Sequence, residues 1–428
     1  MDDASLGKGD NTTFTVLVTG ANSGLGFACC CRLIDEFLYT RPQSQTLHLL
    51  FSTRDTRKGA DTLNRLQAHF QRTLREANGK TLGISLLLES RVKIEGVLVD
   101  LLKLTTVKSL AEQLLRRGQK LDAVVWNAGV AGWLGLNWPK AIWSTCTDLV
   151  QAVTYPAYMT CDVGARAKRQ VQDTTNAEDE PVLGEVFTAN VFGHYLLTHW
   201  LAPLMSRDSR VVWISSTGAV EECFHIDDIQ GLQSLAAYES SKRLTDLIVL
   251  TSDLPATRPY TETFFSSLQP REDSRPIMLV THPGVVATSI SGLHWFLAIF
   301  MTAAFYAARW LGSPWHPIEP YKGAVSMAFA VLAPQLVEQE SREGKGKWGS
   351  ATSVHGDERV ARTQVQGWGY CGTPGVVPPG SVTKGHYRGL QETTRERREE
   401  FEEVGRQVWK KMEEMRVQWE ARLGPINN

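Results

Sequence analysis

The chain has 428 residues, 43% hydrophobic and 21% charged, so it can bury a large core in one extended domain or in two. Its formal net charge of -1 and the lack of a basic block exclude the electrostatic pattern of a nucleic-acid-binding protein. Seven cysteines, three of them consecutive at 29–31, suit neither a disulfide framework nor a metal site, because neighbouring helix residues point in different directions. We expect them to be reduced.

After a polar start that predicts no secretory signal peptide, a buried strand is predicted at 14–18 and an apolar helix up to Leu38. A glycine-rich turn joins them. The first glycine permits the tight turn, the second lets the main chain approach a phosphate, and the third lets the helix pack close to the sheet. Ser23 is a further expected phosphate donor. Because such a turn can also join an ordinary strand and helix, this motif does not decide the function alone. The three glycines are Gly20, Gly24 and Gly26.

Predicted strands then alternate with predicted helices. Strands are expected at 47–53, 92–99 and 121–126, and helices at 60–77 and 105–117. This alternation predicts an α/β fold with a doubly wound, Rossmann-type parallel sheet and right-handed crossovers.

Residues 131–184 are rich in Trp, Thr and Pro and are interpreted as an insertion rather than a second domain. Regular elements return afterwards. They are a helix at 185–205, a strand at 210–214, a helix at about 236–254 and a strand at 277–281. We therefore predict one catalytic domain over residues 14–290.

The apolar segment 295–308 carries no charge and is followed by Arg309 and Trp310. Its fourteen residues fall short of the ~20 that span a bilayer. Two interpretations stay open, a re-entrant or in-plane membrane helix and a helix that lines the substrate cleft. We treat 291–342 as an apolar, substrate- or membrane-proximal helical segment, with another helix at 321–338.

The final segment, 343–428, is predicted to be an irregular glycine-rich linker followed by an amphipathic helix within 392–423. Apolar residues recur along that helix at three- and four-residue spacing, which predicts packing on the body of the protein or on a partner. They are Phe401, Val404, Val408, Met412, Met415, Trp419 and Leu423.

The strongest chemical signal is Tyr238-Glu-Ser-Ser-Lys242. Residues four apart share a helix face, so the phenol and the ammonium can point into one cleft. A phenol with its ordinary pKa of about 10 is a poor acid at neutral pH unless a cation stabilises the phenolate. The alternative is two solvated residues on an amphipathic helix.

Two further groups could join this pair. The predicted strand 210–214 ends in Ser215 and Ser216, at the sheet edge where α/β proteins bind ligands. Only one of the two serines can point at a substrate, because adjacent strand residues face opposite sides. Asn190, on the preceding helix, could hold a water molecule or be an ordinary helix amide.

Together these motifs resemble those of the short-chain dehydrogenase/reductase family, in the family's order across about residues 14–290. The matching pieces are 19–26, Asp100, Asn127-Ala-Gly129, Asn190, Ser216, Tyr238-x-x-x-Lys242 and Pro283-Gly284. One departure is an extra loop around 225–229, between the serine and the tyrosine, which keeps Ser215 open as the alternative to Ser216.

The resemblance implies a nicotinamide cofactor and a role for each matched side chain. Tyr238 would act as general acid/base, Lys242 would lower its pKa and hold the nicotinamide ribose, Ser216 would bond the substrate oxygen, and Asn190 would support a proton relay. Asp100 would approach the adenine. The implied cofactor-binding set is Gly20, Ser23, Gly24, Leu25, Gly26, Thr53, Arg54, Lys58, Asp100, Asn127, Gly129, Tyr238, Lys242, Val286 and Thr288.

The charges after the second predicted strand favour NADPH/NADP+ over NADH. An acid at this place would bind a ribose 2′-hydroxyl, whereas a cation accommodates a 2′-phosphate. Here Arg54 comes first, with Arg57 and Lys58 close behind and Asp55 as the only nearby acid. An NADP(H) enzyme working in the direction of ketone reduction is therefore predicted.

A closer resemblance is to fungal 3-keto-steroid reductases. It is carried by residues 32–37, Trp126-Asn-Ala-Gly129, the insertion 225–230 and the apolar segment after Pro283-Gly284. It implies reduction of a sterol 3-ketone to the 3β-alcohol in ergosterol-type sterol biosynthesis. It also implies a cytosol-facing position at the endoplasmic reticulum membrane or lipid droplets, beside other enzymes of sterol C-4 demethylation.

Two alternatives stay open. The same chemistry could act on another lipid, retinoid or polyketide ketone. The chain could also be a non-catalytic NADP-binding scaffold whose C-terminal helix recruits partners, although an intact Tyr, Lys, Ser and Asn set argues against it.

Overall fold

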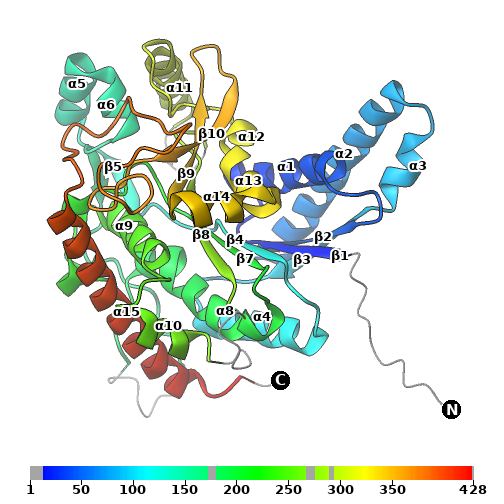
Figure 1. The fold of residues 1–428 in the computed structure, drawn as a ribbon, viewed down its shortest axis with the longest axis horizontal. Coiled ribbons are helices and arrows are strands. Elements are labelled where there is room, and N and C mark those ends of the chain that lie inside the picture. The colour runs from blue at the N-terminus through cyan, green and yellow to red at the C-terminus, as the bar shows by residue number, and fades with distance from the viewer. Residues whose placement is uncertain (1–12, 172–179, 267–274, 289–293, 427–428) are drawn as a thin grey trace.

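The computed structural model describes residues 13–171, 180–266, 275–288 and 294–426. Within them an eight-stranded sheet runs through the molecule in the order β10-β9-β8-β7-β4-β1-β2-β3 (Figure 1). Neighbouring strands are parallel except β9 and β10, which form an antiparallel edge hairpin. The predicted Rossmann-type α/β fold is confirmed. The strands are β1 (Thr13–Val18), β2 (Thr46–Thr53), β3 (Val92–Leu98), β4 (Ala123–Trp126), β7 (Arg210–Ile214), β8 (Ile277–His282), β9 (Lys347–Thr352) and β10 (Glu358–Thr363).

Two apolar cores lie on opposite faces of this sheet. Successive strand residues alternate between them, because side chains along a strand point to opposite faces: Leu17 belongs to one core, Val16 and Val18 to the other. One face is covered by α4 (Leu104–Arg117), α8 (Gly193–Leu201), α9 (Ala237–Leu250) and α15 (Arg395–Leu423). The other is covered by α1 (Gly24–Thr40), α2 (Thr56–Lys80), α13 (Val325–Leu332) and α14 (Gln335–Glu343).

The strand order reverses between β1 and β4. The chain moves outward from β1 to β2 and β3, then returns to place β4 on the other side of β1 and continues to β7 and β8. At such a switch point the loops after the two central strands diverge and leave a crevice beyond their carboxyl ends. The glycine-rich turn and the segment Asn127-Ala-Gly129 are those two loops.

Two expected helices are broken in the structure. The stretch 185–205 comprises α7 (Glu185–Phe187), the π-helix η2 (Thr188–Phe192), α8 and the short 3-10 turn η3 (Ala202–Leu204). The stretch 321–338 comprises α12 (Pro320–Gly323), α13 and part of α14. Pro334 explains the break between α13 and α14, because a proline disfavours the helical conformation at the residue before it, and Ala333 has ψ 114°.

The expectation of an irregular linker after residue 343 was wrong for β9 and β10, which extend the main sheet. Their pattern could not be recognised as buried strands because charged side chains occupy buried positions, with Lys347 and Arg362 at 3% and 0% exposure. Ion pairs and hydrogen bonds compensate for that burial, as between Arg362 and Glu343 at 3.3 Å.

The insertion forms a cap over the carboxyl ends of the strands, together with α11 (Trp295–Trp310) (Figure 1). An apolar cluster joins α6 to α11, with Val153 and Phe305 buried in it. None of the helices in the described ranges combines the length and apolarity that a bilayer crossing requires. The cap elements are β5 (Trp133–Leu136), α5 (Trp138–Thr147), α6 (Leu149–Thr154) and β6 (Met159–Cys161).

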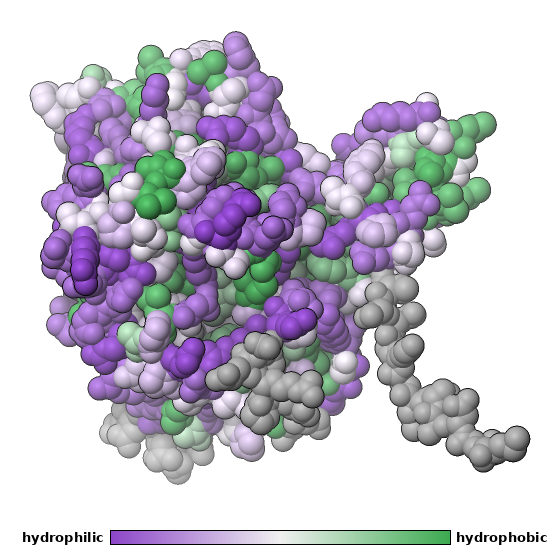
Figure 2. Space-filling view, in the orientation of Figure 1, coloured by the Kyte–Doolittle hydropathy of each residue, from purple (hydrophilic) through white to green (hydrophobic). Residues whose placement is uncertain are grey.

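The C-terminal helix α15 packs on the body of the protein, against α9, α4 and α10 (Arg258–Phe264). Four residues of its predicted apolar stripe are buried: Phe401, Val408, Met412 and Trp419. Beside them the Tyr195 hydroxyl donates a hydrogen bond of 2.7 Å to Glu413. At the far end of the molecule, α3 (Ile84–Glu89), which the sequence did not predict, leaves an apolar tip exposed at Leu82, Leu86 and Leu87 (Figure 2).

Candidate active site

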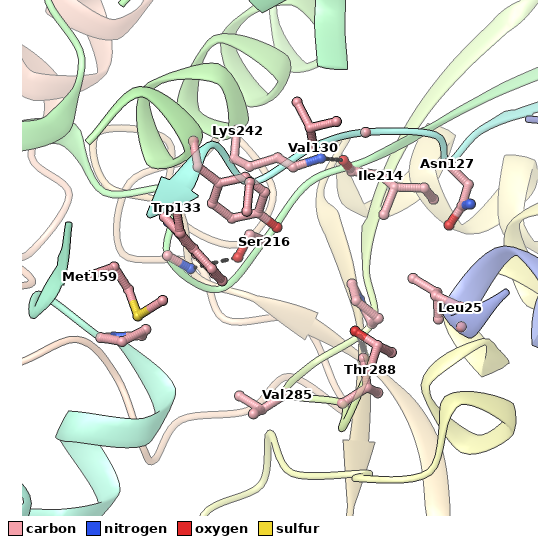
Figure 3. Close-up of a pocket in the computed structure, with 18 of the residues that line it drawn as sticks. Leu25, Asn127, Val130, Trp133, Met159, Ile214, Ser216, Lys242, Val285 and Thr288 are labelled. Carbon is pink, nitrogen blue, oxygen red and sulfur yellow. Dashed lines mark hydrogen bonds between the residues drawn. The ribbon is translucent and has the colours of Figure 1, made fainter. Parts of the chain in front are cut away.

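A cavity of about 780 Å³ lies beyond the carboxyl ends of the parallel strands. This volume is within the range of about 300–1,000 Å³ that ligand pockets occupy. Its inner part is formed by the loops after the strands, and its outer part by the cap and α11. Figure 3 shows Trp133 and Met159 of the cap facing the same cavity as Ser216 and Asn127. All the expected site residues line it except Lys58 and Asn190.

The glycine turn has the geometry of a phosphate cradle. Gly20 has φ +69°, and a side chain there would place its Cβ 2.8 Å from the Cα of Ala128. A Cβ on Gly26 would lie 2.3 Å from the carbonyl oxygen of Gly20. Glycine is therefore required at both positions, and the bare main chain of the turn and the N-terminus of α1 face the cavity, where they fit a pyrophosphate.

Asn127 and Thr19 tie the two central loops together. The Asn127 amide donates to the Thr19 carbonyl at 2.9 Å, and the Asn127 backbone N–H donates to the Thr19 hydroxyl at 3.0 Å. The buried His194 ring lies 2.9 Å from the same hydroxyl. These bonds fix the separation of the β1 and β4 loops, which the cofactor would have to bridge.

The charged residues at the β2 and β3 ends separate into those that face the cavity and those that do not. Arg54 and Asp100 line it. Lys58, expected there, lies 3.5 Å from Asp55 instead, and the Asp55 carboxylate accepts a bond from the Lys58 N–H at 2.8 Å to cap α2. Because Asp55 is engaged in this cap, Arg54 is left as the charged group of the β2 end that faces the cavity.

Ser216, Tyr238 and Lys242 line the cavity together, and Figure 3 shows Ser216 and Lys242 on its wall. The Ser216 hydroxyl accepts a hydrogen bond from the Gly218 N–H at 3.1 Å, and this serine opposes the rise in the pKa of Tyr238. Ser215 is turned toward α9, where its hydroxyl donates to the Lys242 carbonyl at 3.3 Å. The geometry therefore favours Ser216 over Ser215 as the serine that contacts a substrate.

The pKa of Tyr238 is shifted in the direction opposite to that expected. Burial and the nearby Glu239 raise the pKa of the phenol, while Ser216 opposes them. The Lys242 Nζ lies 5.5 Å from the centroid of the Tyr238 ring and donates a hydrogen bond to the Ile214 carbonyl at 2.7 Å. Burial and the positive charge of Lys347 lower the pKa of Lys242 to about 8, and Asp246 acts in the opposite sense. Tyr238 therefore stays protonated at neutral pH.

Asn190 holds the loop after β4 rather than lining the cavity. Its Oδ1 accepts from the Val130 N–H at 2.7 Å, and its Nδ2 donates to the Val130 carbonyl and the Ser241 hydroxyl, both at 3.0 Å. With both ends of the amide engaged, the side chain connects the loop to α9. Its expected part in a proton relay stays a prediction.

Several cavity residues carry no sequence motif. Trp133 of β5 packs edge-on against Tyr238 with ring centroids 5.1 Å apart. Glu239, next to the tyrosine, lines the cavity, and burial raises its pKa to about 7. The Trp-rich composition of the insertion is the sequence signal that could have indicated an aromatic wall of the cavity. The cap and α11 residues of the outer wall are Trp133, Leu136, Trp138, Tyr158, Met159, Leu297, Phe300, Met301 and Phe305.

Three curated relatives match most of the chain. The 3-keto-steroid reductase erg27 of Aspergillus fumigatus is 43% identical over 95% of this chain and 94% of its own. The 3-keto-steroid reductase ERG27 of Gibberella zeae is 38% identical over 96% and 94%. That of Schizosaccharomyces pombe is 30% identical over 82% and 90%.

The search against family models matches none. Among solved structures, an actinorhodin polyketide ketoreductase with NADPH aligns at 17% identity and a TM-score of 0.41, covering 75% of this chain and 91% of that one.

Proposed function

The chain belongs to the family of 3-keto-steroid reductases, and on that premise we propose that its cavity reduces the 3-ketone of a sterol intermediate to the 3β-alcohol in sterol biosynthesis. The observation that carries this assignment is the 43% identity over nearly the whole of both chains. The cavity supports it, because its lining contains a phosphate cradle, the hydroxyl groups of Ser216 and Tyr238, and a large apolar wall.

A nicotinamide cofactor supplies the hydride to the carbonyl carbon when bound. The residues of this chain orient the ketone and provide the proton. Ser216 and Tyr238 present hydroxyl groups to the substrate oxygen from one side of the cavity. Tyr238 then donates its proton to that oxygen as negative charge develops on it. The raised pKa of the phenol suits this direction, because the protonated form is the one that reduction consumes.

We propose that NADPH is preferred over NADH. Arg54 lines the cavity at the end of β2, and the neighbouring carboxylate of Asp55 is engaged in capping α2. A guanidinium group suits a 2′-phosphate, whereas the ribose of NADH calls for an acid at this place. We propose that the cofactor is also contacted by four further residues that line the cavity, Asp100, Asn127, Val286 and Thr288.

We also propose that the cap docks on a membrane, at the cytosolic side of the endoplasmic reticulum or a lipid droplet, so that the sterol enters directly from lipid. Phe300 and Trp138 line the cavity and are also 70% and 50% exposed, so the apolar wall continues onto the outer surface. Trp143 of α5 and Trp295 of α11 are exposed at 72% and 70% beside it. Exposed tryptophans around the mouth of a pocket suit the headgroup region of a bilayer.

The direct test is turnover of NADPH by the purified protein with a 3-ketosterol, compared with retinoid and polyketide ketones. We expect loss of NADPH absorbance with the sterol. Tyr238→Phe should reduce turnover by about 100-fold or more while NADPH affinity is retained. Turnover of a different ketone alone would redirect the substrate assignment, and cofactor binding without turnover of any ketone would favour the scaffold alternative.

A further inference from the structure

A buried ion pair lies behind the cavity. Lys347, on β9, donates to the Asp246 carboxylate at 2.7 Å, and the two side chains are 3% and 0% exposed. Withdrawing two charges from water is costly, and a pair of apolar residues could replace them without that cost. The stability of the fold therefore does not explain why a charged pair is buried at this place.

The pair is connected to the catalytic groups through the main chain. The Lys347 ammonium also donates to the Ser216 carbonyl at 2.7 Å. Two residues before Ser216, the Ile214 carbonyl accepts a hydrogen bond from the Lys242 ammonium, also at 2.7 Å. Two lysines thus hold alternate carbonyls of the segment that carries the serine. Asp246 lies one helical turn after Lys242 on α9, so the same helix supports both ammonium groups.

We propose that Lys347, paired with Asp246, is a positioning residue of the reductase, which fixes the main chain of Ser216 beside Lys242. This inference rests on the proposed reduction. Lys347 touches neither the substrate oxygen nor the hydride acceptor carbon in it. It acts through Ser216 by its hydrogen bond and through Lys242 by its positive charge.

The charged and titratable groups around Lys242 come from four elements. On α9 itself, Asp246 favours the charged ammonium, and the phenol of Tyr238 lies beside it. From β9, Lys347 disfavours it. His194 on α8 faces Lys242 but stays neutral, because burial lowers its pKa to about 3. His282 on β8 faces Lys347, and burial lowers its pKa as well. Lys347 is therefore the cation whose removal changes the titration of Lys242.

The chain offers a matched control in Lys345, two residues earlier. Its ammonium also tethers the start of β9 to the end of the α9 region, through Asp253 at 2.6 Å and Ser252 at 2.8 Å. Neither contact reaches Ser216 or Lys242. Lys345→Met therefore removes a neighbouring, more exposed tether of the same segment and leaves the contacts to Ser216 and Asp246 in place.

The test measures kcat, KM for the 3-ketosterol, NADPH affinity and the pH profile in Lys347→Met, Lys347→Arg and Lys345→Met. We expect Lys347→Met to lower kcat at least about tenfold, because small misplacements of catalytic groups cost such factors. The alkaline limb of kcat should move to higher pH, because Lys242 loses its cationic neighbour. Lys347→Arg should lower kcat but leave the alkaline limb of the pH profile at the wild-type pH, because arginine keeps the positive charge. Lys345→Met should leave both kcat and the alkaline limb unchanged.

Different outcomes separate this inference from the proposed function. A wild-type protein that reduces no 3-ketosterol overturns both. An active wild type together with a folded Lys347→Met variant of equal kcat overturns the positioning role alone. Reduced kcat with an unmoved alkaline limb shows a merely structural residue and overturns the electrostatic part. Where Lys347→Met does not fold, Lys347→Arg decides, because an unchanged kcat there contradicts the fixed geometry at Ser216.

Discussion

Gly26 is the position in the glycine turn where the structure sets the narrowest limit. An added Cβ would lie 2.3 Å from the Gly20 carbonyl oxygen and 2.4 Å from the Asn127 amide nitrogen. Neither can yield easily, because Gly20 is part of the turn and the amide is held on the Thr19 carbonyl at 2.9 Å. Gly26→Ala therefore loses a hydrogen bond worth about 1 kcal/mol and adds about 1–3 kcal/mol of overpacking.

We expect Gly26→Ala to lower the free energy of unfolding by about 2–4 kcal/mol, measured by denaturant titration. NADPH affinity should fall at least about tenfold, because the β1 and β4 loops must move apart. Gly79→Ala is the control: nothing lies within 4 Å of an added Cβ in that helix, so it should stabilise by about 0.5 kcal/mol. A Gly26→Ala protein with wild-type stability and NADPH affinity would refute the close-packing argument.

Three further results are expected. Arg54→Glu should raise KM for NADPH about tenfold and favour NADH, measured in parallel titrations, since one charge-assisted contact is replaced by repulsion; an unchanged cofactor ratio would contradict the role of Arg54. Burial raises the pKa of the Glu239 carboxyl to about 7. The contribution of this carboxyl to the free energy of unfolding is therefore fully present below about pH 4.5 and is lost as the pH rises from about 4.5 through 7. Glu239→Gln should therefore gain stability relative to wild type between pH 5 and pH 8 in denaturation experiments, and a constant difference would argue against the buried carboxyl. Trp143→Glu should weaken liposome flotation, whereas Leu86→Glu, in the equally apolar but distant tip of α3, should not; equal loss in both would remove the cap as the docking surface.

The sheet could be predicted because its central strands are uniformly apolar and its turns carry glycine. The alternation of hydrophobic strands with helices predicted the positions of β1 to β4 along the chain and a parallel sheet. Gly20 and Gly26 could be recognised because the glycine-rich turn itself shows in the sequence. The strand β9 shows no such pattern. Its buried Lys347 looks like a surface residue in the sequence, and only the three-dimensional pairing with Asp246 shows otherwise.

The catalytic groups divide in the same way. The spacing of Tyr238 and Lys242 places them on one helix face, so their meeting could be predicted from the sequence alone. The choice between Ser215 and Ser216 could not, because alternation shows only that the two point apart. The partners of Asn190 depend on where the β4 loop passes, which is a long-range contact between residues 60 positions apart. The direction of the Tyr238 pKa shift depends on burial by the cap, which no local pattern reports.

The cap also explains why a buried phenol suits this cavity. Closing an apolar wall over Tyr238 raises its pKa, which would hinder a dehydrogenase that needs a phenolate base. A reductase needs the opposite, a neutral phenol that gives up its proton only when an oxyanion forms beside it. A phenol is a stronger acid than an aliphatic alcohol, so that transfer remains favourable even when burial has raised the pKa of Tyr238. The same apolar wall that admits a sterol therefore keeps the proton in place until the carbonyl is reduced.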